Sequence, residues 1–137
     1  MAGCSGTSLV RKIGVREGQV LLLDGAPDDV DLAGLGAGGA HVVRRLPRTV
    51  DVTLTFHTSY DALARRLPVL LERTTTAGMV WVCWPKKAAQ KARGISSDLD
   101  ETLVRRLGLD LGFVDVKVAA IDQTWSGLKF VRRLADR

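Results

Sequence analysis

The stretch VDVTLTFHTSYDALARRLPVLLERTTTAGMVWVCWP, residues 50–85, decides the fold. Its first part alternates apolar and polar residues and is rich in β-branched side chains, which predicts a strand over residues 50–57. Its last part is an unbroken apolar run over residues 79–84, closed by Pro85, which predicts a strand buried on both faces. The leucine-rich segment between them has helical spacing. A strand, a helix and a buried strand in this order predict two parallel strands joined by a crossover helix.

The crossover segment carries the signals of a helix start and of a break. Thr58 is the expected N-cap, with Asp61 at the third helical position. The apolar face of the expected helix consists of leucines at helical spacing: Leu63, Leu67, Leu70 and Leu71. Pro68 lies within that face and predicts a kink or a split in the helix. Residues 74–78 are expected to form a linker.

Upstream, short segments predict two more strands and two short helices. Residues 8–13 have helical spacing, with Gly14 as the C-cap. The apolar run over residues 20–23 predicts a strand buried on both faces. A short helix near residues 30–35 and a weak strand over residues 41–46 complete this half of the chain.

Downstream, a polar, mobile loop is expected over residues 86–94, followed by a helix and a strand pair. Asp98 and Glu101 form a capping-box pattern for that helix. The apolar runs at residues 114–121 and 128–131 flank a turn that is too short for a parallel crossover. They therefore predict an antiparallel hairpin.

This order of elements predicts one α/β domain over residues 1–137, with residues 1–8 as a flexible arm. The expected architecture is a three-layer, Rossmann-like, mostly parallel sheet that ends in a C-terminal antiparallel hairpin. A length of 137 residues suits a single core, and 46% hydrophobic with 26% charged residues is typical of a soluble globular protein.

Composition and spacing also exclude several functional classes. No run is long and apolar enough for a membrane span or a secretory leader, so we expect a cytoplasmic protein with no membrane partner. Cys4 and Cys83 are expected as reduced thiols. Cys83 lies in a predicted buried strand and is expected to be inert. The two histidines and two cysteines show no metal-ligand spacing, which predicts that there is no metal site.

The formal net charge of +5 permits an acidic partner without requiring one. Basic residues gather in two places, at residues 86–93 and near the C-terminus at Lys129, Arg132, Arg133 and Arg137. If these formed one patch, it would favour non-specific contact with nucleic acid. No nucleic-acid-binding motif accompanies them, so this interpretation is kept only as an alternative.

A Rossmann-like sheet that ends in an antiparallel hairpin resembles the fold of S-adenosylmethionine-dependent methyltransferases. Residues 18–25 look like the first strand and turn of that fold, residues 50–54 like its fourth strand and residues 77–82 like its fifth. Gly112-Phe113 and the hairpin are similar to its C-terminal end. The resemblance would span residues 14–134, with the third strand of the fold missing.

A second resemblance rests on shorter and more specific segments. They are Ala2-Gly3 with Ser5-Gly6-Thr7, Trp84-Pro85-Lys86-Lys87, and the run from Thr124 to Arg133, TWSGLKFVRR. These segments resemble a family of small bacterial proteins known as domain-of-unknown-function family 3052. That resemblance implies a cytosolic bacterial protein and supplies no catalytic residue.

Two features depart from the methyltransferase pattern. The turn after the first strand holds one glycine, Gly25, where those enzymes have a glycine-rich turn. The second strand is expected to end at Arg44-Arg45, where those enzymes carry an acidic residue for the ribose. The sequence therefore favours a non-catalytic or degenerate Rossmann-like protein that has no cofactor and binds a small anionic ligand or a protein partner. A functional S-adenosylmethionine-dependent methyltransferase is the alternative.

The candidate ligand site follows from the rule that parallel sheets bind ligands beyond the carboxyl ends of their strands. Four predicted turns would meet there. They contribute Asp24 and Gly25; His57, Thr58 and Ser59; Trp84, Lys86 and Lys87; and Asp122, Trp125 and Ser126. Lysine charges and indole faces could hold a planar anion. No catalytic residue is assigned, although His57, oriented by Asp24 or Asp122, is a weak candidate for a general base.

Overall fold

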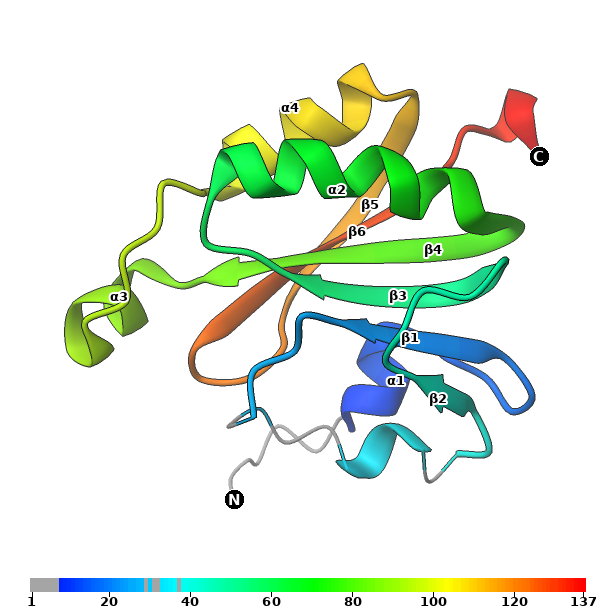
Figure 1. Cartoon of the computed structure of the whole chain (residues 1–137), viewed down its shortest axis with the longest axis horizontal. Helices are drawn as coiled ribbons and strands as arrows, with labels where there is room; N and C mark the ends of the chain where they lie inside the picture. The colour runs from blue at the N-terminus through cyan, green and yellow to red at the C-terminus, as the bar shows by residue number, and fades with distance from the viewer. Residues whose placement is uncertain (1–7, 29, 31–32, 37) are drawn as a thin grey trace.

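The computed structural model describes residues 8–28, 30, 33–36 and 38–137 and contains one six-stranded sheet (Figure 1). The strands are β1 (Val20–Asp24), β2 (His41–Val43), β3 (Val50–Phe56), β4 (Thr74–Pro85), β5 (Phe113–Ala120) and β6 (Trp125–Arg132). Their order is β2-β1-β3-β4-β6-β5, parallel from β2 to β4 and antiparallel in the last two strands. The predicted mostly parallel α/β sheet with a C-terminal hairpin is confirmed.

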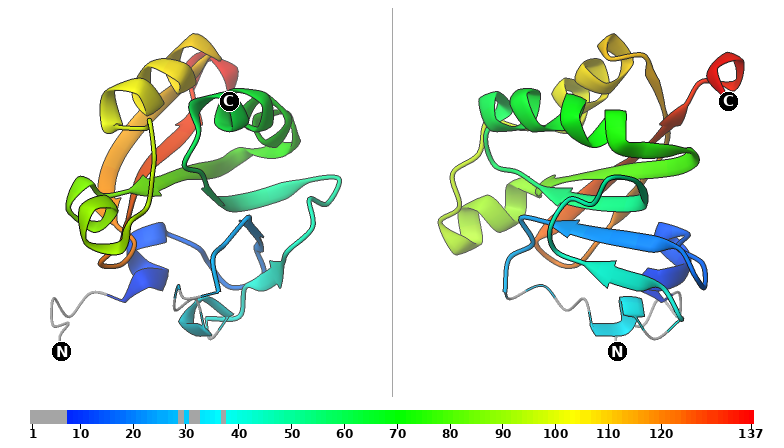
Figure 2. Two further views of the ribbon diagram at one scale, coloured as in Figure 1. Left: turned by 60° about the vertical axis from the view of Figure 1, so that its left-hand side comes forward. Right: turned by 45° about the vertical axis from the view of Figure 1, so that its right-hand side comes forward.

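Helices lie on both faces of this sheet. They are α1 (Leu9–Ile13), α2 (Tyr60–Arg73), α3 (Lys87–Arg93) and α4 (Glu101–Asp110), with two 3-10 helices, η1 (Ala33–Gly36) and η2 (Leu134–Asp136). Figures 1 and 2 show α2 and α4 over one face and the much smaller α1 and η1 against the other. No helix in the described part of the chain is long and apolar enough to cross a membrane.

Two apolar clusters fill the spaces between the layers. Under α2 and α4, leucines from both helices pack on Val80, Val82 and Phe130. On the α1 face, Ile13 packs beside the buried ring of Trp81, whose Nε1 donates a 3.0 Å hydrogen bond to the Ile13 carbonyl. This bond holds α1 on the sheet although the helix has a single buried residue.

The N-terminal elements follow the sequence prediction closely. Ser8 caps α1 by accepting a hydrogen bond from the Arg11 amide, and Gly14 ends the helix with φ at +85°. The central residues of β1 are buried on both faces, as predicted for a continuous apolar strand. The short helix expected near residues 30–35 is η1, and the weak strand β2 is shorter than expected. Cys4, Asp29, Asp31 and residues 1–7 of the expected arm lie outside the described residues.

Helix α2 corrects the predictions about its start and about Pro68. Its N-cap is Ser59, one residue later than expected, because Ser59 Oγ accepts from the Ala62 amide while the Thr58 carbonyl accepts from the Asp98 amide. The helix is not split at Pro68, which sits on its exposed side. Burying one leucine is worth about 1.5–3 kcal/mol. The four buried leucines on the opposite side together outweigh the roughly 3 kcal/mol that an internal proline costs.

The linker expected over residues 74–78 is wrong, because β4 begins directly after α2. Thr74 is buried, donates from its hydroxyl to the Leu70 carbonyl at 2.7 Å and pairs with Val50. Thr75 donates its hydroxyl to Asp51 at 3.1 Å. Three successive threonines favour extended backbone, so the strand starts before its apolar run does.

The polar loop expected over residues 86–94 contains a helix, α3, which ends at Gly94 with φ at +67°. The capping box expected at Asp98 is also wrong. Asp100 is the N-cap of α4 and accepts from the Leu103 amide at 2.9 Å. Asp98 instead accepts from the Tyr60 amide at the start of α2, so its carboxylate ties the two helix starts together.

The C-terminal hairpin is longer than predicted and its turn is shorter. Trp125 and Ser126, expected in the turn, belong to β6, where they pair with Pro85 and Trp84 of β4.

The expected polar face of β3 is also buried: Thr53 and Thr55 are inaccessible because α2 covers that side. Alternation in the sequence therefore predicted the strand correctly, but it did not predict that the polar face of the strand is buried.

Candidate ligand site at the strand ends

The carboxyl ends of β1, β3 and β4 meet at one edge of the sheet, which we call the rim. Asp24 is in register with Thr55, and Phe56 is in register with Cys83. From β1 the chain moves to β2 on one side, and β3 then lies on the other side of β1. The space between the ends of β1 and β3 is thus the topological switch point, where ligands bind in open α/β sheets.

A connected polar network occupies this switch point. Arg66 of α2 holds the Asp24 carboxylate with two hydrogen bonds, from Nε at 3.1 Å and from a terminal nitrogen at 2.7 Å. Thr55 Oγ1 lies 2.8 Å from Asp24 Oδ2 and 2.6 Å from His57 Nε2. The network therefore links β1, β3 and α2 through side chains alone.

The hydrogen-bond pattern fixes the tautomer of His57. A threonine hydroxyl has one proton, and Thr55 donates it to the Asp24 carboxylate. His57 Nε2 must then donate to Thr55 Oγ1, which leaves Nδ1 as the acceptor nitrogen of the neutral ring. His57 is half-buried, and its Nδ1 makes no hydrogen bond with a described residue.

Electrostatics keep both ends of this network in defined charge states. Burial by itself would raise the pKa of Asp24, but the hydrogen bonds from Arg66 and Thr55 outweigh it and hold that pKa below its usual value. Burial lowers the pKa of His57, and the Arg66 charge adds to this, while Asp24 opposes both. At neutral pH the network therefore pairs an ionised Asp24 with a neutral imidazole.

Gly25, Thr58 and Ser59 lie around this network, as the rim prediction placed them. Gly25 has φ at +68°, and a Cβ there would meet only the Phe56 carbonyl, at 3.5 Å. The backbone after β1 is therefore open to close approach by a ligand. Thr58 is exposed, while the hydroxyl of Ser59 is used in capping α2.

The two tryptophans do not share one space. Trp84 is 6% exposed and packs under α2 and α4, whereas Trp125 is 6% exposed and packs on the α1 face. The ring of Phe56 meets that of Trp125 edge-on, with centroids 5.2 Å apart. Contrary to the prediction, the indoles do not present stacking faces to a common planar ligand.

The remaining predicted residues are divided between structure and surface. Asp122 Oδ1 accepts from the amides of Thr124 and Trp125 and closes the hairpin turn. The Lys86 amide donates to the Thr124 carbonyl at 2.8 Å, and Lys87 is exposed at the start of α3. Ser126 lies inside β6. These residues lie at the end of the rim that β4 forms, and β3 separates them from Asp24. Their role in ligand binding stays a prediction.

Sequence reasoning missed Thr55 and Arg66. Alternation places Thr55 on the polar face of its strand, and no pattern in the sequence singles out Arg66 on its helix. Their signal exists only in three dimensions, because it depends on the register of β1 against β3 and on the rotation of α2.

The structure also bears on Cys83, on the metal-ligating side chains and on the two basic clusters. Cys83 is fully buried, as predicted, and its pKa is raised well above the usual value, first by burial and then by the Asp122 charge. The inertness of this thiol stays a prediction. The described ranges contain no group of three or more metal-ligating side chains. The two basic clusters do not form one patch, because α3 and the C-terminus lie at opposite ends of the sheet (Figure 1).

Comparisons with known proteins give matches in structure and none in sequence. No protein-family model matches the chain, and no curated protein matches it. The resemblance to family 3052 therefore stays a prediction.

Solved structures of similar architecture include several methyltransferases. One is the magnesium protoporphyrin IX methyltransferase of Synechocystis PCC 6803 with bound SAH, at TM-score 0.63 and 11% identity, covering 91% of this chain and 80% of that one. A SAM-dependent methyltransferase from Aquifex aeolicus matches at TM-score 0.60 and 14% identity, covering 89% and 86%. The 1,6-didemethyltoxoflavin-N1-methyltransferase of Burkholderia thailandensis matches at 0.62 and 12%, covering 90% and 74%. The chain thus has the Rossmann-like methyltransferase fold.

Proposed function

We propose that this protein binds S-adenosylmethionine at the switch point between β1 and β3 and serves as a methyltransferase. The observation that carries the proposal is the coincidence of two features. The sheet reproduces the methyltransferase fold over about nine-tenths of the chain. The point where that fold places ligands holds an open backbone turn at Gly25 and an imidazole nitrogen that no described residue pairs.

The residues at β1 and β3 fit this cofactor. Gly25 leaves room for close approach of the backbone, and the segment His57–Ser59 would line the opposite side. A neutral His57 adds no charge repulsion against a positively charged sulfonium. When bound, the cofactor supplies an electrophilic methyl group. The chain's own contribution to the chemistry would be His57 Nδ1, which can take a proton from the acceptor molecule.

The end of β2 supports a second candidate function. Arg44 and Arg45 follow β2 and are exposed, and neither guanidinium is paired with another described residue. The methyltransferase pattern has a carboxylate at this point, whereas arginine suits a phosphate. This observation favours non-catalytic binding of a small anion, for which adenosine 5′-monophosphate is a suitable probe.

Isothermal titration calorimetry separates the two functions. We expect micromolar affinity for S-adenosylmethionine, at least about tenfold tighter than for adenosine 5′-monophosphate, which corresponds to about 1.4 kcal/mol. The reverse preference would favour the anion-binding function, and that preference should be lost in an Arg44→Gln/Arg45→Gln variant. No heat with millimolar S-adenosylmethionine would exclude the methyltransferase.

A pair of glycine variants locates the binding. Gly25→Ala places a Cβ where the backbone is open to the ligand, and should weaken binding about tenfold. Gly18→Ala is the matched control, because Gly18 also has positive φ, at +82°, with nothing within 4 Å of a Cβ, and it lies before β1 at the other edge. Equal loss of affinity in both variants would mean that backbone strain, and not the rim, explains the effect.

A further inference from the structure

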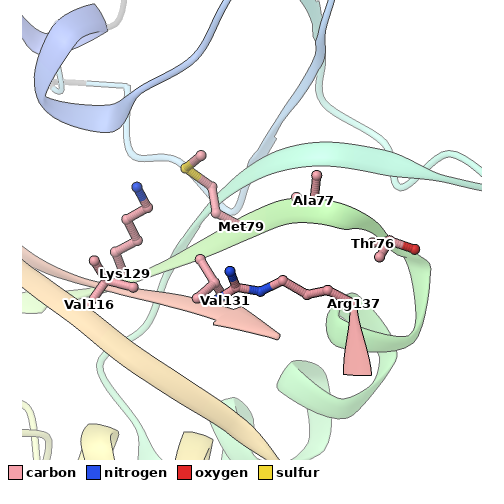
Figure 3. A pocket seen from close by; sticks show the side chains of 8 residues that line it. Thr76, Ala77, Met79, Val116, Lys129, Val131 and Arg137 are labelled. Carbon is pink, nitrogen blue, oxygen red and sulfur yellow. The ribbon is translucent and has the colours of Figure 1, made fainter. Parts of the chain in front are cut away.

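A hollow of about 340 Å³ lies at the edge of the sheet opposite the rim (Figure 3). It is formed where β4 begins and where β5 and β6 run past it, on the face that carries α1. The lining residues are Thr76, Ala77, Gly78, Met79, Val116, Lys129, Val131 and Arg137. The small α1 layer leaves this part of the sheet uncovered.

The polar part of the lining is cationic. Lys129 is half-buried and makes no hydrogen bond or ion pair with any described residue. Burial lowers the pKa of Lys129, and the neighbouring charge of Lys117 lowers it further. Arg137 donates from Nε to the Arg132 carbonyl at 2.9 Å, which leaves its terminal nitrogens free of that contact. None of the lining side chains is acidic.

The rest of the lining is mostly apolar. Val116 is 50% exposed on the edge strand β5, beside Val131 and Met79. Figure 3 shows Lys129 rising beside Met79, while the side chain of Arg137 runs from the chain end toward Val131. Two cationic groups thus border an exposed apolar floor. This is an uncommon pairing, because cations without partners are usually placed where water solvates them fully.

We propose that this hollow binds an amphipathic monoanion, a carboxylate that carries a short alkyl chain. The carboxylate would pair with Lys129 and with the planar fork of Arg137, which matches its geometry. The alkyl chain would cover Val116, Val131 and Met79. The volume is at the lower end of small-molecule sites and suits a ligand of this size. The site is independent of the proposed function, because it lies at the other edge of the sheet.

Octanoate is the probe, followed in the full chain by amide NMR. Saturable shifts are expected at Gly78, Lys129 and Val131, and the Lys129 ammonium should titrate at higher pH when octanoate is bound. Octan-1-ol is the matched neutral ligand and should bind at least about tenfold more weakly. Equal binding of the alcohol, shifts scattered over the surface, or no saturation at millimolar octanoate would overturn the proposal.

Single-residue variants test whether Lys129 and Arg137 bind the carboxylate of octanoate. Lys129→Gln should weaken octanoate binding about tenfold and keep the wild-type dispersion of the amide spectrum, since it removes a half-buried charge. Arg137→Gln, at an exposed residue, gives a second test that does not depend on the sheet. Lys91→Gln on α3 is the control and should bind octanoate like the wild type. If both Lys129→Gln and Arg137→Gln bind normally, the hollow is not the site.

Discussion

Thr55 connects Asp24 and His57, two residues that were predicted separately, into one site. Asp24 and His57 could be placed at the same rim from the sequence, because both follow predicted parallel strands. Their connection could not be predicted, since it runs through the Thr55 hydroxyl, whose neighbours are set by the register of β1 against β3. With Arg66 holding Asp24 ionised, the single Thr55 proton decides which nitrogen of His57 is available to a ligand.

Thr55→Val should therefore remove the preference of His57 for one tautomer, while it keeps a side chain of the same shape in the strand. Nitrogen-15 NMR of the imidazole is expected to show mainly the Nε2–H form in the wild type, with a pKa that burial lowers from its usual value, and a mixture of tautomers in the variant. Loss of the hydrogen bonds should cost about 1 kcal/mol of unfolding free energy.

The matched control for that change is Thr53→Val. Thr53 lies two residues earlier on the same strand and face, and its buried hydroxyl has no partner. Its replacement should leave the His57 spectrum as in the wild type and keep or raise stability. A wild-type tautomer ratio in Thr55→Val would contradict the assignment of the Thr55 proton to Asp24.

At the scale of elements, periodicity predicted the order and type of nearly every segment, but side chains from distant segments decided where several begin. Asp98 looked like the start of its own helix but accepts from the Tyr60 amide at the start of α2. The threonines after α2 looked like a linker and join β4, since Thr74 is bonded to Leu70 and its carbonyl accepts from Arg132 at 2.6 Å. Tyr60 is remote in sequence from Asp98, and Arg132 is remote from Thr74, so local patterns contain no sign of these two contacts.

Helix α4 offers a test of how closely the elements are fitted. Ala is normally favoured over Gly within a helix by roughly 1 kcal/mol. Gly108→Ala should instead destabilise the protein by about 1–3 kcal/mol, because a Cβ at Gly108 would overlap the ring of Phe130. Urea denaturation measures the difference. Gly34→Ala in η1, where a Cβ meets nothing within 4 Å, is the control, and a stabilised Gly108→Ala would show that α4 packs more loosely.

At the scale of the molecule, the sheet is a shortened form of the methyltransferase sheet. Among the described residues, the chain passes from β2 to β3 without a further strand or helix, so β2 is the edge. One face has the full cover of α2 and α4, and the other has only α1 and η1. The chain therefore keeps the switch point of the fold with little structure around it, and exposes part of the opposite edge.

The central claim is that the switch point binds the cofactor of the related fold. Amide chemical-shift mapping with S-adenosylhomocysteine tests it most directly, because it reports location as well as binding. We expect saturable shifts concentrated at Asp24, Gly25 and the segment His57–Ser59, with residues lining the hollow unaffected. Shifts confined to other surfaces, or no saturable shifts at millimolar ligand, would contradict the claim.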